Sequence, residues 1–225
     1  MMKKLYVILY AMILACSIGT VVLMILSPDK VPMHYNFAGE ADRIGSKYEN
    51  ILWPTLAAGL GLFFLLMAKR QRKKNEPANE KILVYTGICT LAFFTALGFY
   101  FMIKAIRYDP DAAPALSYDD ASRFVNVGIG ALLVVIGNKI PKARRNAVIG
   151  LRTKWSMAND TVWQKSQRFA GIASVIAGFC MMLSAMFVVG IWNTLVLVGI
   201  LLVFLVLCVA ASRRYYRTYR EEEQA

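Results

Sequence analysis

Residues 169–212 read FAGIASVIAGFCMMLSAMFVVGIWNTLVLVGILLVFLVLCVAAS, and this stretch settles the class of protein. Its 44 residues include no Asp, Glu, Lys, Arg or His. As one helix they would reach roughly 66 Å at a rise of about 1.5 Å per residue, about twice the hydrocarbon thickness of a bilayer. We therefore predict two membrane-spanning helices, joined by a turn at Gly190-Ile191-Trp192-Asn193.

Four further charge-free stretches precede this segment, at residues 5–27, 51–68, 82–103 and 124–138. The last is only 15 residues long, so a full span requires Arg123 and Lys139 to extend their charged ends toward the headgroups. A re-entrant segment is the alternative. With 58% hydrophobic residues in the chain, the pattern predicts an all-α integral membrane protein, a bundle of six transmembrane helices.

Basic residues gather on one side of the predicted spans. Of the 26 Lys and Arg residues, 20 lie before the first span, in the second and fourth loops or after the last span. Because basic loops are retained in the cytoplasm, both termini are predicted to be cytoplasmic. We expect an N-terminal membrane domain at residues 1–107 and a second membrane domain at residues 108–225, with three helices each.

This distribution explains the formal net charge of +12 without any need for nucleic-acid binding. Basic residues beside a span contact anionic headgroups, so the lipid bilayer is the expected partner. No ionisable Asp, Glu, Lys, Arg or His lies inside a predicted span, which disfavours a proton-driven transporter. His34 is the single histidine and the four cysteines all lie in predicted spans, so we predict no metal site, no cofactor and no catalytic residue.

Small residues recur at helical spacing in two spans. They are Ala11, Ala15 and Gly19 in the first span, and Ala170, Ser174 and Gly178 in the fifth. Such ridges allow helices to approach closely. We interpret them as packing surfaces within one bundle, with a dimer interface as the alternative.

The outer loop, residues 32–47, reads PMHYNFAGEADRIGSK. Its polar residues alternate with apolar ones at the start, which is typical of a short strand or of a flap lying on the bilayer surface. His34, Asp42 and Ser46 are the residue types of a hydrolytic triad, but they lie within 13 residues and no nucleophile elbow is evident. We interpret them as groups that hydrogen-bond one another, or as a polar recognition surface.

The inner loop, residues 137–155, reads GNKIPKARRNAVIGLRTKW. Asn159 or Asp160 is a favourable N-cap for a helix that continues into the fifth span. Five side chains suit the headgroup layer or could clamp phosphates: Trp155, Trp163, Arg145, Arg152 and Arg168. The simpler interpretation is an interfacial connector anchored to anionic lipid.

Both loops resemble those of known bacterial membrane proteins. The inner loop and the helix after it resemble the signature of the SdpI family, through Gly137, Asn138, Pro141, Arg145, Asn146, Gly150, Arg152, Thr153, Trp155, Trp163, Arg168 and Gly171. The outer loop resembles a small membrane domain of unknown function that often precedes the SdpI segment, through Pro32, His34, Asn36, Gly39, Asp42, Gly45, Ser46 and Lys47. The two resemblances together cover most of the chain.

The resemblance implies a multi-pass protein of the bacterial cytoplasmic membrane that gives immunity to a secreted, membrane-active toxin peptide. The outer loop would bind this extracellular peptide, through His34, Asn36, Gly39, Asp42, Gly45 and Lys47. Acidic residues in the third loop could attract a basic peptide: Asp109, Asp111, Asp119 and Asp120. The inner loop could pass a signal to a cytosolic regulator.

Two other function classes stay open at this point. A transporter or lipid-binding protein would have a polar cavity between its helices, for which Asn126, Asn138 and Asn193 are the predicted lining groups. A membrane enzyme would have clustered ionisable residues, and the sequence shows no enzyme signature.

Overall fold

The computed structural model describes residues 2–36, 40–108 and 118–219. Its elements are α1 (Met2–Leu26), β1 (Lys30–Tyr35), β2 (Ala41–Ser46), the 3-10 helix η1 (Lys47–Ile51), α2 (Leu52–Lys73), α3 (Pro77–Ile106), α4 (Tyr118–Gly137), the 3-10 helix η2 (Ile140–Lys142), α5 (Asp160–Phe187) and α6 (Ile191–Tyr219). Within these ranges, six helical segments are long and apolar enough to cross a membrane. The predicted six-helix membrane bundle is therefore confirmed. The short charge-free stretch at residues 124–138 lies within one of the six segments, Asp120–Lys142.

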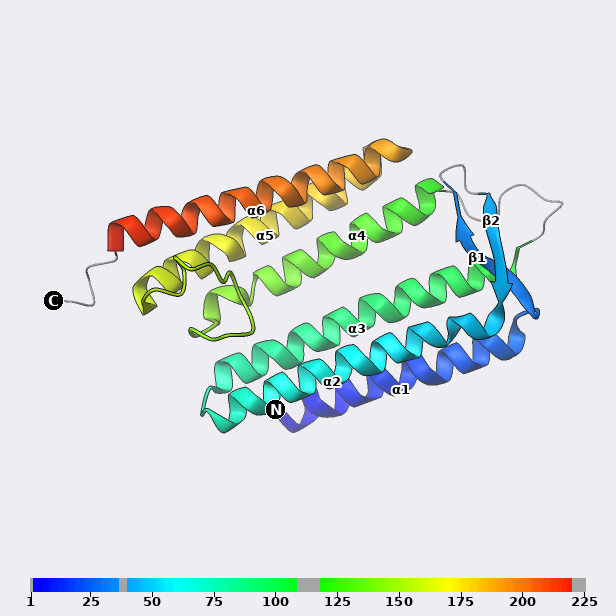
Figure 1. The fold of residues 1–225 in the computed structure, drawn as a ribbon, viewed down its shortest axis with the longest axis horizontal. Helices are drawn as coiled ribbons and strands as arrows, with labels where there is room; N and C mark the ends of the chain where they lie inside the picture. The colour runs from blue at the N-terminus through cyan, green and yellow to red at the C-terminus, as the bar shows by residue number, and fades with distance from the viewer. Residues whose placement is uncertain (1, 37–39, 109–117, 220–225) are drawn as a thin grey trace.

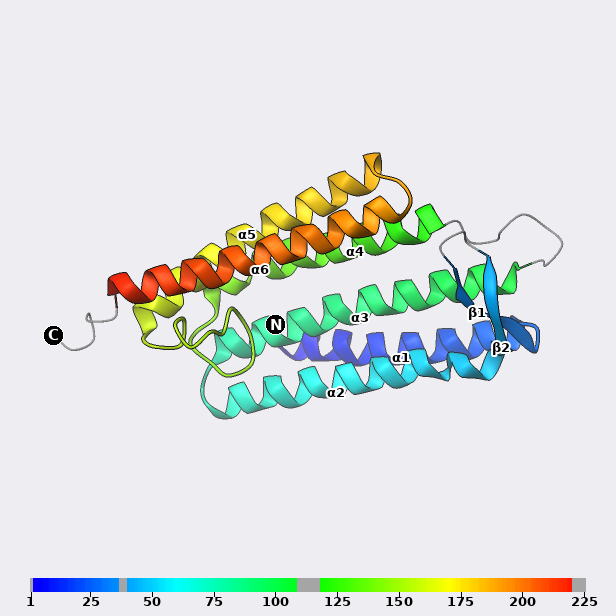
Figure 2. The same ribbon diagram turned by 45° about the horizontal axis from the view of Figure 1, so that its top comes forward.

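The six helices lie along one long axis in two groups (Figure 1). Helices α1, α2 and α3 pack against one another, and α4 and α6 both pack against α5. The hairpin of β1 and β2 lies at one end of the bundle, whereas α1 begins and α6 ends at the other (Figures 1 and 2). An even number of spans requires the two chain ends to share a side, and the assignment of that side to the cytoplasm stays a prediction.

The turn between the last two helices lies close to its predicted place. Helix α5 ends at Phe187 and α6 begins at Ile191, so the break precedes most of the predicted tetrapeptide. Gly190 has a φ of +64°, in the left-handed region that favours glycine. Asn193 belongs to α6 rather than to the turn, and its side chain is buried inside the bundle.

Glycines allow α4 and α5 to approach closely. A Cβ on Gly178 would lie 2.4 Å from the carbonyl oxygen of Gly130, which is closer than any real side chain tolerates. Ala170 and Ser174 are buried on the same helix. The ridge predicted in the fifth span is therefore a packing surface inside the bundle, as expected.

The ridge predicted in the first span is only partly right. Gly19 faces the ring of Phe99, where a Cβ would lie 2.2 Å from a ring carbon. Ala11 and Ala15, however, are exposed. Helix α1 instead buries a different set of side chains: Leu9, Cys16 and Thr20.

A buried polar cluster joins α4 to α6. The amide nitrogen of Asn126 donates to the side-chain oxygen of Asn193 at 2.5 Å and to its carbonyl oxygen at 3.1 Å. The amide nitrogen of Asn193 in turn donates to Ser122 Oγ at 3.0 Å. Asn138 is exposed beyond the opposite end of α4. The three asparagines that would line a polar cavity in a transporter therefore do not meet in one place: Asn126 and Asn193 hydrogen-bond each other across a helix contact, and Asn138 lies at the far end of α4.

Candidate functional site

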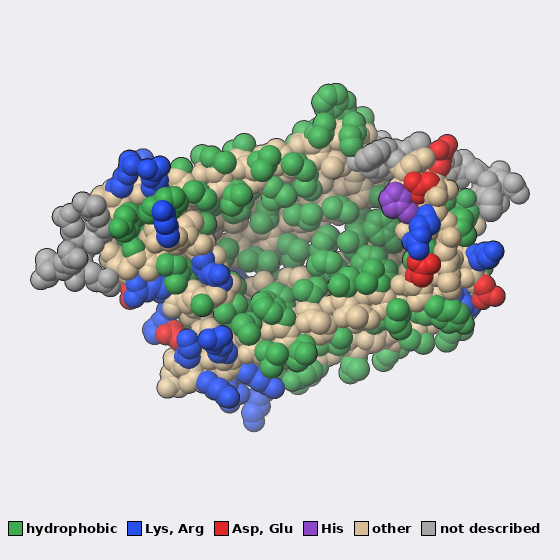
Figure 3. All heavy atoms as spheres, viewed as in Figure 1, with side chains coloured by type: hydrophobic (Ala, Val, Ile, Leu, Met, Phe, Trp, Pro, Cys, Tyr) green, Lys and Arg blue, Asp and Glu red, His purple; other side chains and the backbone are tan. Residues whose placement is uncertain are grey.

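Charged side chains gather at the two ends of the bundle, and hydrophobic ones cover its middle (Figure 3). The end that carries the inner loop shows mostly Lys and Arg on the visible face. The hairpin end shows both signs of charge and the single histidine. The two loops singled out in the sequence therefore lie at opposite ends of the membrane-spanning helices.

The outer loop folds into an antiparallel hairpin. Val31 pairs with Gly45 and Tyr35 with Ala41, and the register shifts on both sides of His34. The sequence predicted one short strand, and the structure has two. The second strand, β2, supplies the backbone hydrogen-bond partners that β1 would lack if it were isolated. Gly45 has a packing role, since a Cβ there would lie 2.2 Å from an oxygen of Glu49.

Polar pairs order the tip of the hairpin, as interpreted from the sequence. His34 Nδ1 lies 2.6 Å from Asp42 Oδ1, and both side chains are largely exposed. The side-chain amide of Asn36 donates to Glu40 Oε2 at 2.9 Å and accepts the backbone N–H of Glu40 at 3.0 Å. Gly39 lies outside the described residues. So do two of the acidic residues expected to attract a basic peptide, Asp109 and Asp111, and the side chain of a third, Asp119.

Ser46 and Lys47 anchor the base of the hairpin. Ser46 caps η1: its Oγ accepts the N–H of Tyr48 at 3.3 Å, and a Glu49 carboxylate oxygen accepts the N–H of Ser46 at 3.1 Å. It is therefore not the third member of a triad with His34. Lys47 Nζ contacts Asp29 Oδ1 at 3.0 Å and the carbonyl oxygen of Ser27 at 3.3 Å. These contacts connect the hairpin to the end of α1.

A cavity of about 410 Å³ lies beneath the hairpin, among β1, η1, α2, α3 and α4. Its apolar lining comes from Met33, Leu52, Trp53, Phe101 and Ala121, and its polar lining from His34, Asn36, Glu49 and Asn50. Its size falls within the range of about 300–1,000 Å³ that small-ligand pockets occupy. This mixture of apolar wall and polar rim suits one apolar side chain of a peptide together with a nearby polar group.

Tyr35 lines the same cavity. Its hydroxyl is buried and has no hydrogen-bond partner among the described residues. Burial raises the pKa of this phenol to about 12, so the group is neutral at physiological pH. A buried donor without a partner is costly, which makes Tyr35 a group that a bound ligand could satisfy.

The inner loop is folded against the bundle and does not lie loosely on the headgroups. Trp163 is 1% exposed, and its indole Nε1 donates to the carbonyl oxygen of Ala143 at 2.7 Å. The prediction that Trp163 lies in the headgroup layer is therefore wrong. Asn159 caps α5 as predicted, accepting the N–H of Val162 at 2.8 Å. Its amide nitrogen also donates to the carbonyl oxygen of Tyr219, at the end of α6, at 2.9 Å.

Gln167, which the sequence analysis missed, organises the centre of the inner loop. Its side-chain oxygen accepts the N–H of Leu151 at 2.8 Å, and its nitrogen donates to the carbonyl oxygen of Leu151 at 2.9 Å. Gly150 has a φ of +102°, and a Cβ there would lie 2.4 Å from the Gln167 oxygen. The spacing was an available signal, because Gln167 lies four residues from both Trp163 and Gly171 and thus shares their helix face.

Two arginines expected to clamp phosphates hold the protein's own backbone and side chains. Arg145 Nε lies 2.9 Å from Asp160 Oδ1, and its Nη1 donates to the carbonyl oxygen of Ala158 at 3.2 Å. Arg152 Nη1 donates to the carbonyl oxygen of Ala147. Both side chains therefore have partners within the inner loop and its junction with α5.

Two polar residues complete the fold of the loop. Asn146 is buried, and its side-chain oxygen accepts the N–H groups of Val148 at 2.7 Å and Ile149 at 2.8 Å. Thr153 Oγ1 lies 2.9 Å from Ser212 Oγ, a contact that joins the loop to α6. Ser212 was missed because it closes a charge-free stretch, where nothing in the local sequence marks it as a loop partner.

The remaining residues of the inner motif lie around this core. A Cβ on Gly171 would lie 2.7 Å from the carbonyl oxygen of Gly137 and 2.6 Å from Pro141 Cγ, so these three residues form one tight junction. Trp155 is half-buried, with the Arg213 guanidinium 5.8 Å from its ring centre. Arg168 is exposed and lines a cavity of about 890 Å³ at the mouth of the loop. In the described ranges, no three His, Cys, Asp or Glu side chains come together as a metal site.

Two segments of the chain match models of known protein families. Residues 142–211 match the model of the SdpI/YfhL protein family. This SdpI/YfhL segment is thus a similarity of residues 142–211 to that family. Residues 11–58, which include the whole hairpin, match the Domain of unknown function (DUF1648). The two resemblances seen in the sequence are thus confirmed.

The similarity extends beyond the two matched segments. The chain is 25% identical over 195 residues to the immunity protein SdpI of Bacillus subtilis (strain 168), which covers 84% of this chain and 85% of the relative. No solved structure matches. The SdpI/YfhL segment contains most of the inner motif, whereas Gly137, Asn138 and Pro141 precede it. With its six apolar helices, the chain is a multi-pass membrane protein.

Proposed function

We propose that this protein protects a bacterial cell against a secreted, membrane-active peptide, which it binds at the hairpin end. The similarity to an immunity protein over most of both chains supports this class of function. The observation that carries the choice of site is the hairpin-covered cavity of about 410 Å³. It combines apolar walls with the exposed His34–Asp42 pair on its rim.

The proposal places both chain ends in the cytoplasm and the hairpin outside. The excess of Lys and Arg at the inner-loop end supports this orientation. A secreted peptide then arrives at the face that carries the hairpin. A cytosolic regulator, if the protein signals inward, would meet the exposed side chains of Arg144 and Arg168.

The hairpin end offers two kinds of contact to an amphipathic peptide. An apolar side chain of the peptide would enter the cavity against Trp53 and Phe101. A basic group would approach the carboxylate of Asp42, whose side chain is 44% exposed and pairs only with His34 in the described part of the hairpin. A carboxylate that is exposed on one side can accept a second charged hydrogen bond without losing its first.

A killing assay tests this proposal. The protein is expressed in a bacterium sensitive to the sporulation-delaying peptide, and survival is measured over a peptide titration with membrane expression checked by immunoblot. We expect Ala121→Trp, which fills the cavity, and Asp42→Ala each to lower the highest peptide concentration that the cells survive. The expected decrease is about tenfold, the equivalent of about 1.4 kcal/mol. Ala15→Trp, on the lipid-facing surface of α1, is the matched control and should protect fully.

The results also separate the two ends of the molecule. Arg168→Ala alters the exposed inner surface and should leave direct protection unchanged. Full protection by Ala121→Trp and Asp42→Ala at normal expression would contradict a binding site at the hairpin. Absence of protection by the unaltered protein would contradict immunity to this peptide.

A further inference from the structure

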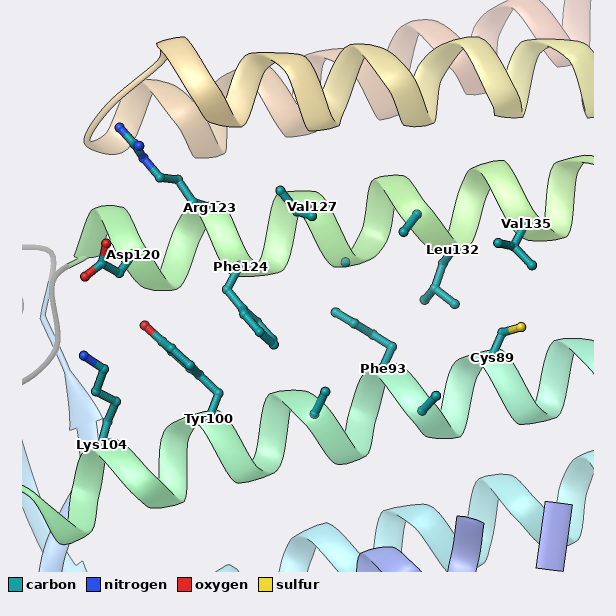
Figure 4. A pocket seen from close by; sticks show the side chains of 14 residues that line it. Cys89, Phe93, Tyr100, Lys104, Asp120, Arg123, Phe124, Val127, Leu132 and Val135 are labelled. Carbon is teal, nitrogen blue, oxygen red and sulfur yellow. The ribbon is translucent and has the colours of Figure 1, made fainter. Parts of the chain in front are cut away.

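A long groove runs between α3 and α4, where the two groups of helices face each other. It has a volume of about 680 Å³ and is lined from Cys89 to Lys104 on α3 and from Asp120 to Val135 on α4. Figure 3 shows a hollow with hydrophobic walls between the two groups of helices, and Figure 4 shows the side chains that line the groove. Except at one end, these side chains are hydrophobic.

The groove stays open because small residues line it. Ala92, Ala96 and Ala131 are exposed and leave space that larger side chains would fill. At the inner-loop end the two groups of helices are joined instead by the backbone N–H of Arg144, which donates to the side-chain oxygen of Asn79 at 2.9 Å. A groove of this kind at membrane depth is filled by something apolar, because water has no hydrogen-bond partners there.

The dimensions of the groove select the occupant. The 15-residue interval from Cys89 to Lys104 corresponds to roughly 22 Å of helix, longer than the roughly 15 Å of one leaflet's hydrocarbon layer. A helix of this length with its side chains is about 10–12 Å wide and occupies roughly 1,700 Å³ or more, so it does not fit a groove of about 680 Å³. A single extended hydrocarbon chain does.

Polar groups mark only the hairpin end of the groove. The Tyr100 hydroxyl is buried without a hydrogen-bond partner among the described residues. The Tyr100 ring stacks on Phe124 at a centroid distance of 4.8 Å, and Lys104 Nζ lies 6.0 Å from the centre of the Tyr100 ring. Figure 4 shows Lys104 and Asp120 on opposite helices at this mouth, while Arg123 points away from it.

We propose that the groove holds one acyl chain of a phospholipid from the leaflet at the hairpin end. The chain lies along Phe93, Val127 and Leu132, and the phosphate lies at the mouth. There it accepts hydrogen bonds from the Tyr100 hydroxyl and the Lys104 ammonium group. This arrangement gives the orphaned phenol a partner and places the charged headgroup at the membrane boundary, as amphiphile binding requires. The proposal does not depend on toxin immunity.

Native mass spectrometry of the full chain tests the proposal. The protein is purified in mild detergent, incubated with palmitoyl-oleoyl phosphatidylglycerol, and the fraction that retains one phospholipid is measured over a lipid titration. Ala96→Trp fills the groove and should abolish the one-lipid species. Ala15→Trp adds the same side chain to an exposed site on α1 and should retain the lipid as the unaltered protein does.

A second pair of variants tests the headgroup contacts without filling the groove. Tyr100→Phe and Lys104→Ala should each weaken retention by about tenfold, since each removes one hydrogen bond to a charged phosphate. Equal retention by Ala96→Trp and the unaltered protein would overturn the proposal. So would a one-lipid species that neither Tyr100→Phe nor Lys104→Ala weakens, because the phosphate would then lie elsewhere.

Discussion

Both hydrogen-bonding groups of the Leu151 backbone are held by one side chain, the amide of Gln167. The two contacts measure 2.8 and 2.9 Å, and Gln167 is fully buried. This pairing imitates the way a β-strand partner would hold a residue, although Gln167 lies on a helix. Gln167 therefore holds the centre of the inner loop against α5.

Replacing Gln167 by Leu should destabilise the inner loop. The change keeps the approximate volume but leaves the N–H of Leu151 without its partner, at a cost of about 1–3 kcal/mol. The carbonyl oxygen of Leu151 loses the Gln167 amide but keeps the Ser156 hydroxyl, which donates to it at 2.8 Å. Thermal unfolding in detergent should show the loss, and trypsin should cleave faster after Arg145 or Arg152. Gln164→Leu, on the exposed face of the same helix, is the matched control. Equal stability of the two variants would contradict the role given to Gln167.

Two glycines with positive φ should respond differently to alanine. Gly190 has a φ of +64° and nothing within 4 Å of an added Cβ, so Gly190→Ala meets only the backbone cost of about 1 kcal/mol. Gly150→Ala meets the same kind of cost and a clash with the Gln167 amide. We expect Gly150→Ala to be the more destabilising by about 1–3 kcal/mol. Unfolding midpoints in the same detergent provide the comparison.

Close packing of α4 and α5 can be tested with a similar pair. In Gly178→Ala the new Cβ meets the carbonyl oxygen of Gly130 at 2.4 Å, so the helices must separate, at a cost of about 1–3 kcal/mol. In Gly199→Ala the new Cβ meets nothing within 4 Å. The second variant should be neutral or slightly stabilised, since alanine favours helix more than glycine does. A neutral Gly178→Ala would show that the two helices do not approach this closely.

The hydrogen bond between Asn126 and Asn193 should contribute modestly to the free energy of unfolding. Hydrogen bonds between membrane helices contribute about 0.6 kcal/mol on average and up to about 1.7 kcal/mol. We expect Asn126→Leu and Asn193→Leu each to destabilise the bundle, and the double variant to be less destabilised than the sum of the two. Strict additivity in a double-mutant cycle would show that the two side chains act independently.

The orientation of the bundle gives a prediction on intact cells. A membrane-impermeant maleimide should label Asp42→Cys on the exposed hairpin and should not label Arg168→Cys until the cells are opened. The native cysteines serve as background, because all four lie within helices predicted to cross the membrane. The reverse labelling pattern would place the hairpin in the cytoplasm and would remove the proposed toxin site with it.

The sequence predicted the site less completely than the fold. It identified the His34–Asp42 contact and the Asn159 cap, because these partners lie within a few residues of one another or follow local capping rules. It placed Trp163 at the lipid headgroups and missed Gln167. Tryptophan and glutamine are compatible with either a membrane surface or a buried contact, and only the neighbouring loop decides between the two.

The six spans can be read from the length and polarity of the apolar runs alone, because a helix in lipid must satisfy its own backbone and needs about 20 apolar residues to cross. The partners of the polar residues depend on the folded chain. Asn126 and Asn193 are 67 residues apart, and Thr153 and Ser212 are 59 apart. No local pattern specifies such pairs, since they form only when the helices that carry them are packed side by side. The groove between α3 and α4 is decided in the same way, by how far two helices of different groups remain apart.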